Sequence, residues 1–320
     1  MSGKPRNIWV AILAGGDGQP LRPSTTNARG ISTPTQYCSL NGGQSLLQIS
    51  LQRALAVTSR ERIVAVVTEA HRSWWEHEFF ASPRAAVVVQ PCNRGTGLGV
   101  LLALLVIAKS DPEAGVMFIP SDHHVEHEAV LAEYLREATA PEVMDGDKLT
   151  LLGMSPYAPD SGFGYLSPAP DSGVGMRPVL DFVEKPAQAI AAELIRAGSV
   201  LNRGIIAGRI SQFIALYPRH MRQVILDLQA IVEQWPDSRV PSAGLISLYS
   251  RLSALDFSCD VLQKRPESLQ LLNRATAFDR AAFKHGLAPA PMNDTDHPQV
   301  AQRGFAWVAQ SPRLAPYDDC

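Results

Sequence analysis

The sequence predicts an α/β fold in which helices sandwich an open, mostly parallel or mixed sheet. The first observation is a series of apolar runs of strand type, at residues 8–14, 62–68 and 85–89. The second is that stretches with helical spacing, at residues 44–55 and 71–80, separate these runs. Strands that alternate with helices favour a mostly parallel sheet. With 320 residues, of which 46% are apolar, the chain is long enough to bury a sizeable core.

The same alternation continues along the chain. A helix at residues 98–109 follows the third strand, and further strands are expected at residues 115–120 and 149–154. Residues 209–235 have helical periodicity with charged side chains interspersed.

Composition and charge exclude several classes of function. The formal net charge is −2 and the pI is about 6.4, so there is no general electrostatic reason to bind nucleic acid or an anionic membrane. The longest apolar stretch, residues 98–108, is too short to span a bilayer. None of the cysteines shows C-x-x-C spacing, which argues against a zinc ribbon; they are Cys38, Cys92, Cys259 and Cys320. Reduced thiols are the simplest interpretation, and we expect a cytoplasmic protein.

A glycine-rich loop follows the first strand, with Gly15, Gly16 and Gly18 inside four residues. Glycine lets backbone N–H groups come close to a ligand, and a nest of such groups attracts phosphate oxygens. A plain strand-to-helix turn has the same composition, so the loop alone leaves both interpretations open. The dinucleotide fingerprint does not fit because Leu21 stands at its third glycine, and a Walker loop does not fit because its Gly-Lys-Ser/Thr ending is absent.

The apolar strand at residues 115–120 is followed by an acid, Asp122. Ligands of open parallel sheets lie at the carboxyl ends of the strands, and Mg²⁺ prefers one or two carboxylates together with phosphate oxygens. Asp122 is therefore a candidate magnesium ligand beside a triphosphate. His123 and His127 offer a rival interpretation, a zinc site on one helix face, but Glu126 directly precedes His127 and the H-E-x-x-H order is missing.

Short motifs recur along the chain after the glycine loop, which reads L-A-G-G-x-G-x-x-L-x-P at residues 13–23. They are P-x-Q-Y at residues 34–37, S-L-L-Q-x-x-x-x-R at 45–53, P-x-N-R-G-T at 91–96, P-S-D-H at 120–123, V-x-x-F-x-E-K-P at 179–186 and N-x-G-I at 202–205. Taken in order, these motifs resemble the sugar-nucleotide pyrophosphorylase (nucleotidyltransferase) family, whose glycine loop reads L-A-G-G-x-G-T-R-L-x-P, and most closely its mannose-1-phosphate guanylyltransferase branch.

This resemblance covers roughly residues 8–285 and implies a nucleotide-diphospho-sugar transferase, GT-A-like fold without a C-terminal β-helix. We therefore expect a nucleotidyltransferase-like domain over residues 1–285 and a short tail over residues 286–320. The implied reaction is nucleotidyl transfer from GTP to mannose 1-phosphate, or a related hexose 1-phosphate, giving GDP-mannose and pyrophosphate. The implied cofactor is Mg²⁺, and a homodimer or a complex with a partner subunit stays open.

The resemblance also implies roles for individual residues. Asp122, Arg22 and Lys185 would be catalytic, and Asp122 and Asp279 would bind the metal. Nucleotide binding would involve Leu13, Ala14, Gly15, Gly16, Gly18, Asn93, Arg94, Gly95 and Thr96. The sugar phosphate would meet Gly164, Tyr165, Glu184, Lys185, Asn202 and Gly204. Of these, Glu184 supplies an acceptor for sugar hydroxyls and Lys185 a cation for the phosphate.

Three positions depart from the family pattern. Pro20 stands where the family has Arg, Thr35 where it has Lys, and Arg203 where it has a small polar residue. Losing one preorganised charge-stabilising donor commonly costs about 10²–10³ in rate. Arg22, Arg29 and Arg203 are candidates to replace the missing cations. Two functions therefore stay open: an active transferase, or a catalytically impaired homologue that binds nucleotide or nucleotide-sugar as a regulatory or partner subunit.

Overall fold

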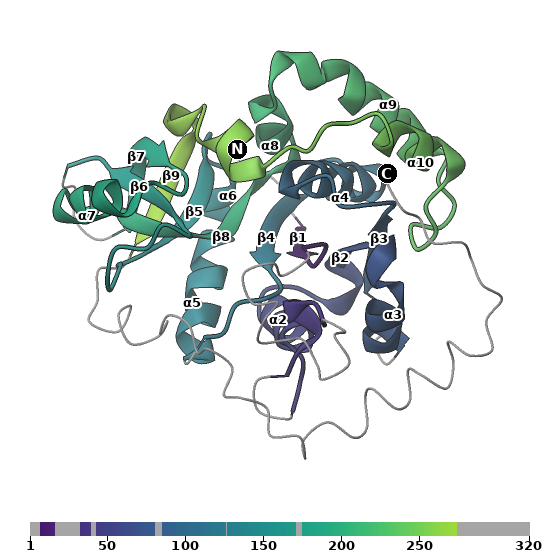
Figure 1. Cartoon of the computed structure of the whole chain (residues 1–320), viewed down its shortest axis with the longest axis horizontal. Helices are drawn as coiled ribbons and strands as arrows, with labels where there is room; N and C mark the ends of the chain where they lie inside the picture. The colour runs from purple at the N-terminus through teal and green to yellow at the C-terminus, as the bar shows by residue number, and fades with distance from the viewer. Residues whose placement is uncertain are drawn as a thin grey trace.

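The computed structural model describes residues 7–16, 33–39, 43–80, 85–125, 127–170 and 175–273 (Figure 1). In this part of the chain a nine-stranded mixed sheet lies between helices, which confirms the expected α/β architecture. The described residues contain no β-helix, and none of their helices is both long and apolar enough to cross a membrane. The boundary predicted at residue 285 lies outside the described residues and stays a prediction.

Four parallel strands form the first half of the sheet, in the order β3-β2-β1-β4. They are β1 Ile8–Leu13, β2 Ile63–Thr68, β3 Ala86–Gln90 and β4 Gly115–Pro120, each at an expected position. Val10 of β1 pairs with Ile63 of β2 on one side and with Met117 of β4 on the other. All six residues of β2 are buried, as is usual for a parallel strand with helices on both faces.

The second half of the sheet is organised around β8, Val200–Arg209, which runs antiparallel to β4. The remaining strands are β5 Leu149–Met154, β6 Gly164–Pro168, β7 Gly175–Val183 and β9 Leu269–Asn273. The pairings β8–β5, β5–β9, β9–β7, β7–β6 and β6–β8 close into a ring of strands. As a result, Asn202 of β8 pairs with Gly153 of β5 and with Gly164 of β6.

Helices cover both faces of the sheet (Figure 1). One face carries α4 Thr96–Ser110, α8 Ile210–Leu216, α9 Arg222–Glu233 and α10 Ala243–Tyr249. The other carries α2 Leu46–Leu55, α3 Arg72–Phe80, α5 Glu128–Ala138 and α6 Pro141–Met144, and α7 Gln188–Arg196 lies beside β6. α4 is apolar on nearly all sides because it packs between the sheet and the outer helices.

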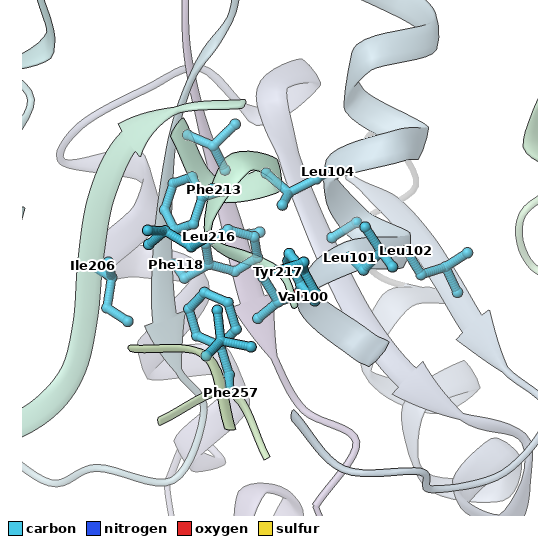
Figure 2. Packing of buried hydrophobic residues seen from close by; sticks show 14 of the residues in the cluster. Val100, Leu101, Leu102, Leu104, Phe118, Ile206, Phe213, Leu216, Tyr217 and Phe257 are labelled. Carbon is cyan, nitrogen blue, oxygen red and sulfur yellow. The ribbon is translucent and has the colours of Figure 1, made fainter. Parts of the chain in front are cut away.

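An aromatic cluster fixes the end of β4 against the helices on the α4 face (Figure 2). The rings of Phe118 in β4 and Phe213 in α8 are edge to face, with centroids 5.1 Å apart. Phe257 lies in a short π-helix at Phe257–Leu262, and its ring centroid is 6.2 Å from that of Phe213. This packing holds the strand that leads to Asp122 in a fixed position.

The stretch expected to be helical at residues 209–235 is divided into two helices. α8 ends at Leu216, and α9 begins only at Arg222, after a 3₁₀ turn at Arg219–Met221. The cause is Pro218, because the residue before a proline is driven out of the helical region and Tyr217 has an extended ψ of 140°.

Candidate functional site

The carboxyl ends of β1 and β4 form the centre of the candidate site. The two strands are parallel neighbours, with Leu13 paired to Pro120, so the residues that follow them emerge at the same edge of the sheet. Ala14, Gly15 and Gly16 follow β1, and Asp122 follows β4. The hydroxyl of Ser121 donates to the carbonyl oxygen of Leu13 at 2.7 Å, which ties the two strand ends together.

The glycine loop is held from below by the side-chain amide of Gln36. This amide donates to the carbonyl oxygens of Ala14 and Gly16, at 2.9 Å each, and Gln36 is only 2% exposed. A Cβ atom at Gly15 would lie 2.9 Å from Nε2 of Gln90, whereas Gly16 has open space around it. The loop is therefore tightly supported at Gly15 and accessible at Gly16. Gly18 and Arg22, which complete the predicted loop site, lie outside the described residues.

Arg53 supports the turn that carries Asp122. Its guanidinium makes a two-pronged ion pair with Glu128, with the shortest contact at 2.7 Å, and donates to the carbonyl oxygen of His123 at 2.8 Å. Ser50 donates to the carbonyl oxygen of Pro120 at 3.3 Å. Neither Arg53 nor Gln36 was predicted as a site residue. Both lie in stretches that match the family pattern, which is the one signal in the sequence that points to them.

The side chain of Asp122 is 49% exposed. Partial burial raises the pKa of Asp122, and its own backbone N–H and the charge of Arg203 act in the opposite direction. A carboxylate that loses hydration in this way favours a nearby cation. The donor type and the position at the strand end are compatible with Mg²⁺, and binding of the metal by Asp122 stays a prediction. Asp279, the predicted second ligand, lies outside the described residues.

The zinc interpretation receives no support from the geometry. The described His, Cys, Asp and Glu side chains form no group of three that could hold a metal ion. His123 lies 3.9 Å from Asp122, and its pKa is lowered by burial and by the positive charges of Arg203 and Arg53. His123 instead helps to fix the turn, because its carbonyl oxygen accepts a hydrogen bond from Arg53.

The second half of the candidate site is the Glu184–Lys185 pair after β7. Burial raises the pKa of Glu184 to about 7, and the charge of Asp256 acts in the same direction. The Lys185 ammonium, 3.8 Å from the carboxylate, acts in the opposite direction. Oε2 of Glu184 is buried and has no hydrogen-bond partner among the residues that the structure describes. Any side chain at Gly164 would overlap this oxygen, so only glycine fits there. Lys185 has a φ of +46°, a backbone strain that is typical of functional sites.

Asn202 and Gly204 lie next to this pair, on β8. Asn202 pairs with Gly164 in the sheet, and its side-chain oxygen accepts the N–H of Gly204 at 3.0 Å. Gly204 has a φ of +71°, which explains the glycine in the N-x-G motif. Tyr165 differs from the expectation: its ring is fully buried beside α7, and its hydroxyl is bonded to the backbone of Asp160. Its side chain therefore cannot contact a ligand in this conformation.

The N-R-G-T motif at the start of α4 makes contacts within the chain. Arg94 donates from Nε to the carbonyl oxygen of Tyr249 at 3.2 Å, and its own carbonyl oxygen accepts the N–H of Leu255. Thr96 accepts the N–H of Phe257 at 2.9 Å. Gly95, with a φ of +83°, has no room for a side chain because of the Leu255 backbone. These contacts fix the helix start. Contact of Asn93, Arg94, Gly95 and Thr96 with nucleotide stays a prediction.

The sequence lacks the family's cationic side chains at positions 20 and 35, and the structure describes only the second of these positions. Thr35, where the family has Lys, is 5% exposed, and none of the described residues makes a hydrogen bond with its hydroxyl. Threonine is uncharged, so position 35 itself supplies no cation. Pro20, Arg22 and Arg29 lie outside the described residues.

The sheet topology, the glycine loop and the acid at a neighbouring strand end define a nucleotide-diphospho-sugar transferase fold. Residues 10–237 match the Nucleotidyl transferase family, and the chain belongs to this family.

Among its relatives are the alginate biosynthesis protein AlgA of Pseudomonas aeruginosa, 27% identical over 214 residues (65% of this chain, 43% of that protein), and the mannose-1-phosphate guanylyltransferase of Salmonella montevideo, 27% identical over 217 residues (65% and 44%). This chain therefore spans less than half the length of these two relatives. A solved structure from Thermus thermophilus, named mannose-1-phosphate geranyltransferase, is 25% identical with a TM-score of 0.67, covering 83% of this chain and 73% of that one.

Proposed function

We propose that the chain transfers a nucleotidyl group from a nucleoside triphosphate to a hexose 1-phosphate. GTP and mannose 1-phosphate are the proposed pair, and GDP-mannose and pyrophosphate the products. Membership of the family and the names of its relatives support the reaction class and the choice of substrates. The observation that carries the proposal is the meeting of Gly15–Gly16 and Asp122 at the paired ends of β1 and β4.

In this reaction a phosphate oxygen of the hexose 1-phosphate attacks the α-phosphorus of the triphosphate. The bond from the α-phosphorus to the bridging oxygen breaks, and pyrophosphate leaves. Two polyanions must be held in line, so position and positive charge are the main contributions of the protein. The backbone around Gly16 would bind the triphosphate, and Lys185 the phosphate of the sugar.

Glu184 would select the sugar. No described residue donates a hydrogen bond to its buried Oε2, and a ligand hydroxyl would supply such a donor. Asp122, and Asp279 with it, would hold Mg²⁺, which supplies charge neutralisation between the phosphates when it is bound. Gln36 and Arg53 would act indirectly, because Gln36 positions the glycine loop and Arg53 positions the turn that carries Asp122.

A second candidate function is a homologue that binds nucleotide or nucleotide-sugar but turns over poorly, as a regulatory or partner subunit. The buried Thr35 favours it, because a neutral side chain stands where the family has lysine.

The deciding experiment is a screen of pyrophosphate release for several nucleoside triphosphates against several hexose 1-phosphates, with Mg²⁺. Turnover that is highest with GTP and mannose 1-phosphate supports the first function. Thermal stabilisation by nucleotide without turnover supports the second. If no pair gives turnover and no nucleotide stabilises the protein, both candidate functions are contradicted.

A further inference from the structure

Arg203 is a buried positive charge beside the proposed metal ligand. β8 runs antiparallel to β4, and Phe118 pairs with Ile206. Beyond this last printed pair, β8 leads back to Arg203 and β4 leads on to Asp122, so both residues lie at the same end of the two neighbouring strands. Arg203 is only 8% exposed.

The guanidinium of Arg203 is held on one side by an aromatic ring. Its Cζ lies 4.5 Å from the ring centroid of Phe163, a distance typical of a cation–π contact. The Nε atom is buried and has no hydrogen-bond partner within the described part of the chain. The charged groups that act on this guanidinium are the carboxylates of Asp122 and Asp160, which favour its charged form against the effect of burial.

We propose that Arg203 lowers the affinity of Asp122 for divalent metal ions. A guanidinium stays charged at all physiological pH values, so a dication on Asp122 must bind against a fixed positive charge. Coulomb repulsion between a unit charge and a dication amounts, in water, to roughly a tenfold loss of affinity at a separation of about 6 Å, and we take this as the scale of the effect. The site would therefore hold Mg²⁺ poorly unless phosphate arrives with it. This inference rests on the proposed role of Asp122 as a metal ligand.

The test measures Mn²⁺ binding, as a spectroscopic substitute for Mg²⁺, by electron paramagnetic resonance at pH 8 without nucleotide. Arg203→Met keeps the volume of the side chain and removes the charge, and we expect it to tighten Mn²⁺ binding about tenfold. Arg203→Lys keeps the charge and should bind Mn²⁺ as weakly as the wild type. In the double variant that combines Arg203→Met with Asp122→Asn, the increase in Mn²⁺ affinity should disappear. Arg203→Gln provides a second neutral variant if Arg203→Met does not fold.

An exposed arginine on α7 provides the matched control, since Arg196→Met should leave Mn²⁺ affinity unchanged. The proposal is overturned if the neutral variants bind no more tightly than the wild type, or if the gain survives the loss of Asp122. Pyrophosphate release is measured separately. If the wild type shows no turnover but the neutral variants bind Mn²⁺ more tightly, the result contradicts the proposed function and supports this inference.

Discussion

The side-chain amide of Gln36 donates to the carbonyl oxygen of Gly16 at 2.9 Å, and so couples a buried 3₁₀ turn to the glycine loop. Gln36→Leu removes the donor and leaves the carbonyls of Ala14 and Gly16 without this partner. We expect the free energy of unfolding to fall by about 2 kcal/mol, measured by urea denaturation, and stabilisation by GTP to shrink. Gln229→Leu, at an exposed position of α9, should change neither quantity. Equal effects of the two substitutions would show that Gln36 does not support the loop.

Gly95→Ala tests the contact between the N-R-G-T motif and the segment around Leu255. The substitution adds a methyl group that overlaps the Leu255 backbone, at a φ of +83°. Gly198→Ala is matched in backbone conformation, with a φ of +88°, but has nothing within 4 Å. We expect a loss of about 1 kcal/mol at Gly198, from the left-handed backbone alone, and about 3 kcal/mol or more at Gly95. Similar losses in calorimetric unfolding would mean that the segment moves aside freely.

Arg53→Met tests the support of the Asp122 turn. The substitution removes the buried half of an ion pair and leaves the carbonyl oxygen of His123 without its donor. Because Glu128 is 46% exposed and can rehydrate, we expect a loss of about 2–3 kcal/mol rather than the full cost of a buried pair. Arg136→Met, which loses one exposed hydrogen bond, should cost less than about 1 kcal/mol. A cost for Arg53 as small as that for Arg136 would contradict the structural role assigned to it.

Glu184→Gln tests the raised pKa of this carboxyl through the pH dependence of stability. The folded pKa is about 7 and the ordinary value is 4.5, so between these values the folded chain holds a proton that the unfolded chain has released. Stability of the wild type should therefore fall as the pH rises from 4.5 to 7, by up to about 3 kcal/mol from this group.

The glutamine variant lacks that dependence, so its stability relative to the wild type should increase from pH 5 to pH 8. Urea unfolding of both proteins at these two pH values provides the measurement. A difference that is constant with pH would show that Glu184 titrates normally.

Much of the fold could be predicted because the parallel strands are mostly buried. Apart from their last residues, Thr68 and Gln90, β2 and β3 consist of Val, Ile and Ala, and such runs bounded by helices have few alternatives. The ring formed by β5, β6, β7, β8 and β9 could not be predicted, since its pairings join strands far apart in the sequence. The break before Pro218 had a local signal, but the helical periodicity on both sides concealed it.

The same distinction applies to the site. Gly15 and Asp122 could be placed together because parallel strand ends share one edge, a rule that needs no tertiary detail. The contact from Arg94 to the Tyr249 backbone spans 155 residues, and no local pattern shows that the arginine is used in this way. Tyr165 was assigned to the sugar phosphate from a motif alone, and the pleat of β6 directs its ring into the core instead.

The most direct test of the account is pyrophosphate release from GTP and mannose 1-phosphate by the wild type and by Asp122→Asn, with Mg²⁺. We expect measurable release by the wild type and a loss of about 10²-fold or more in the variant, because the metal-binding carboxylate at the carboxyl edge is gone. Equal release by the two proteins would contradict the central claim that the chemistry takes place between the glycine loop and Asp122.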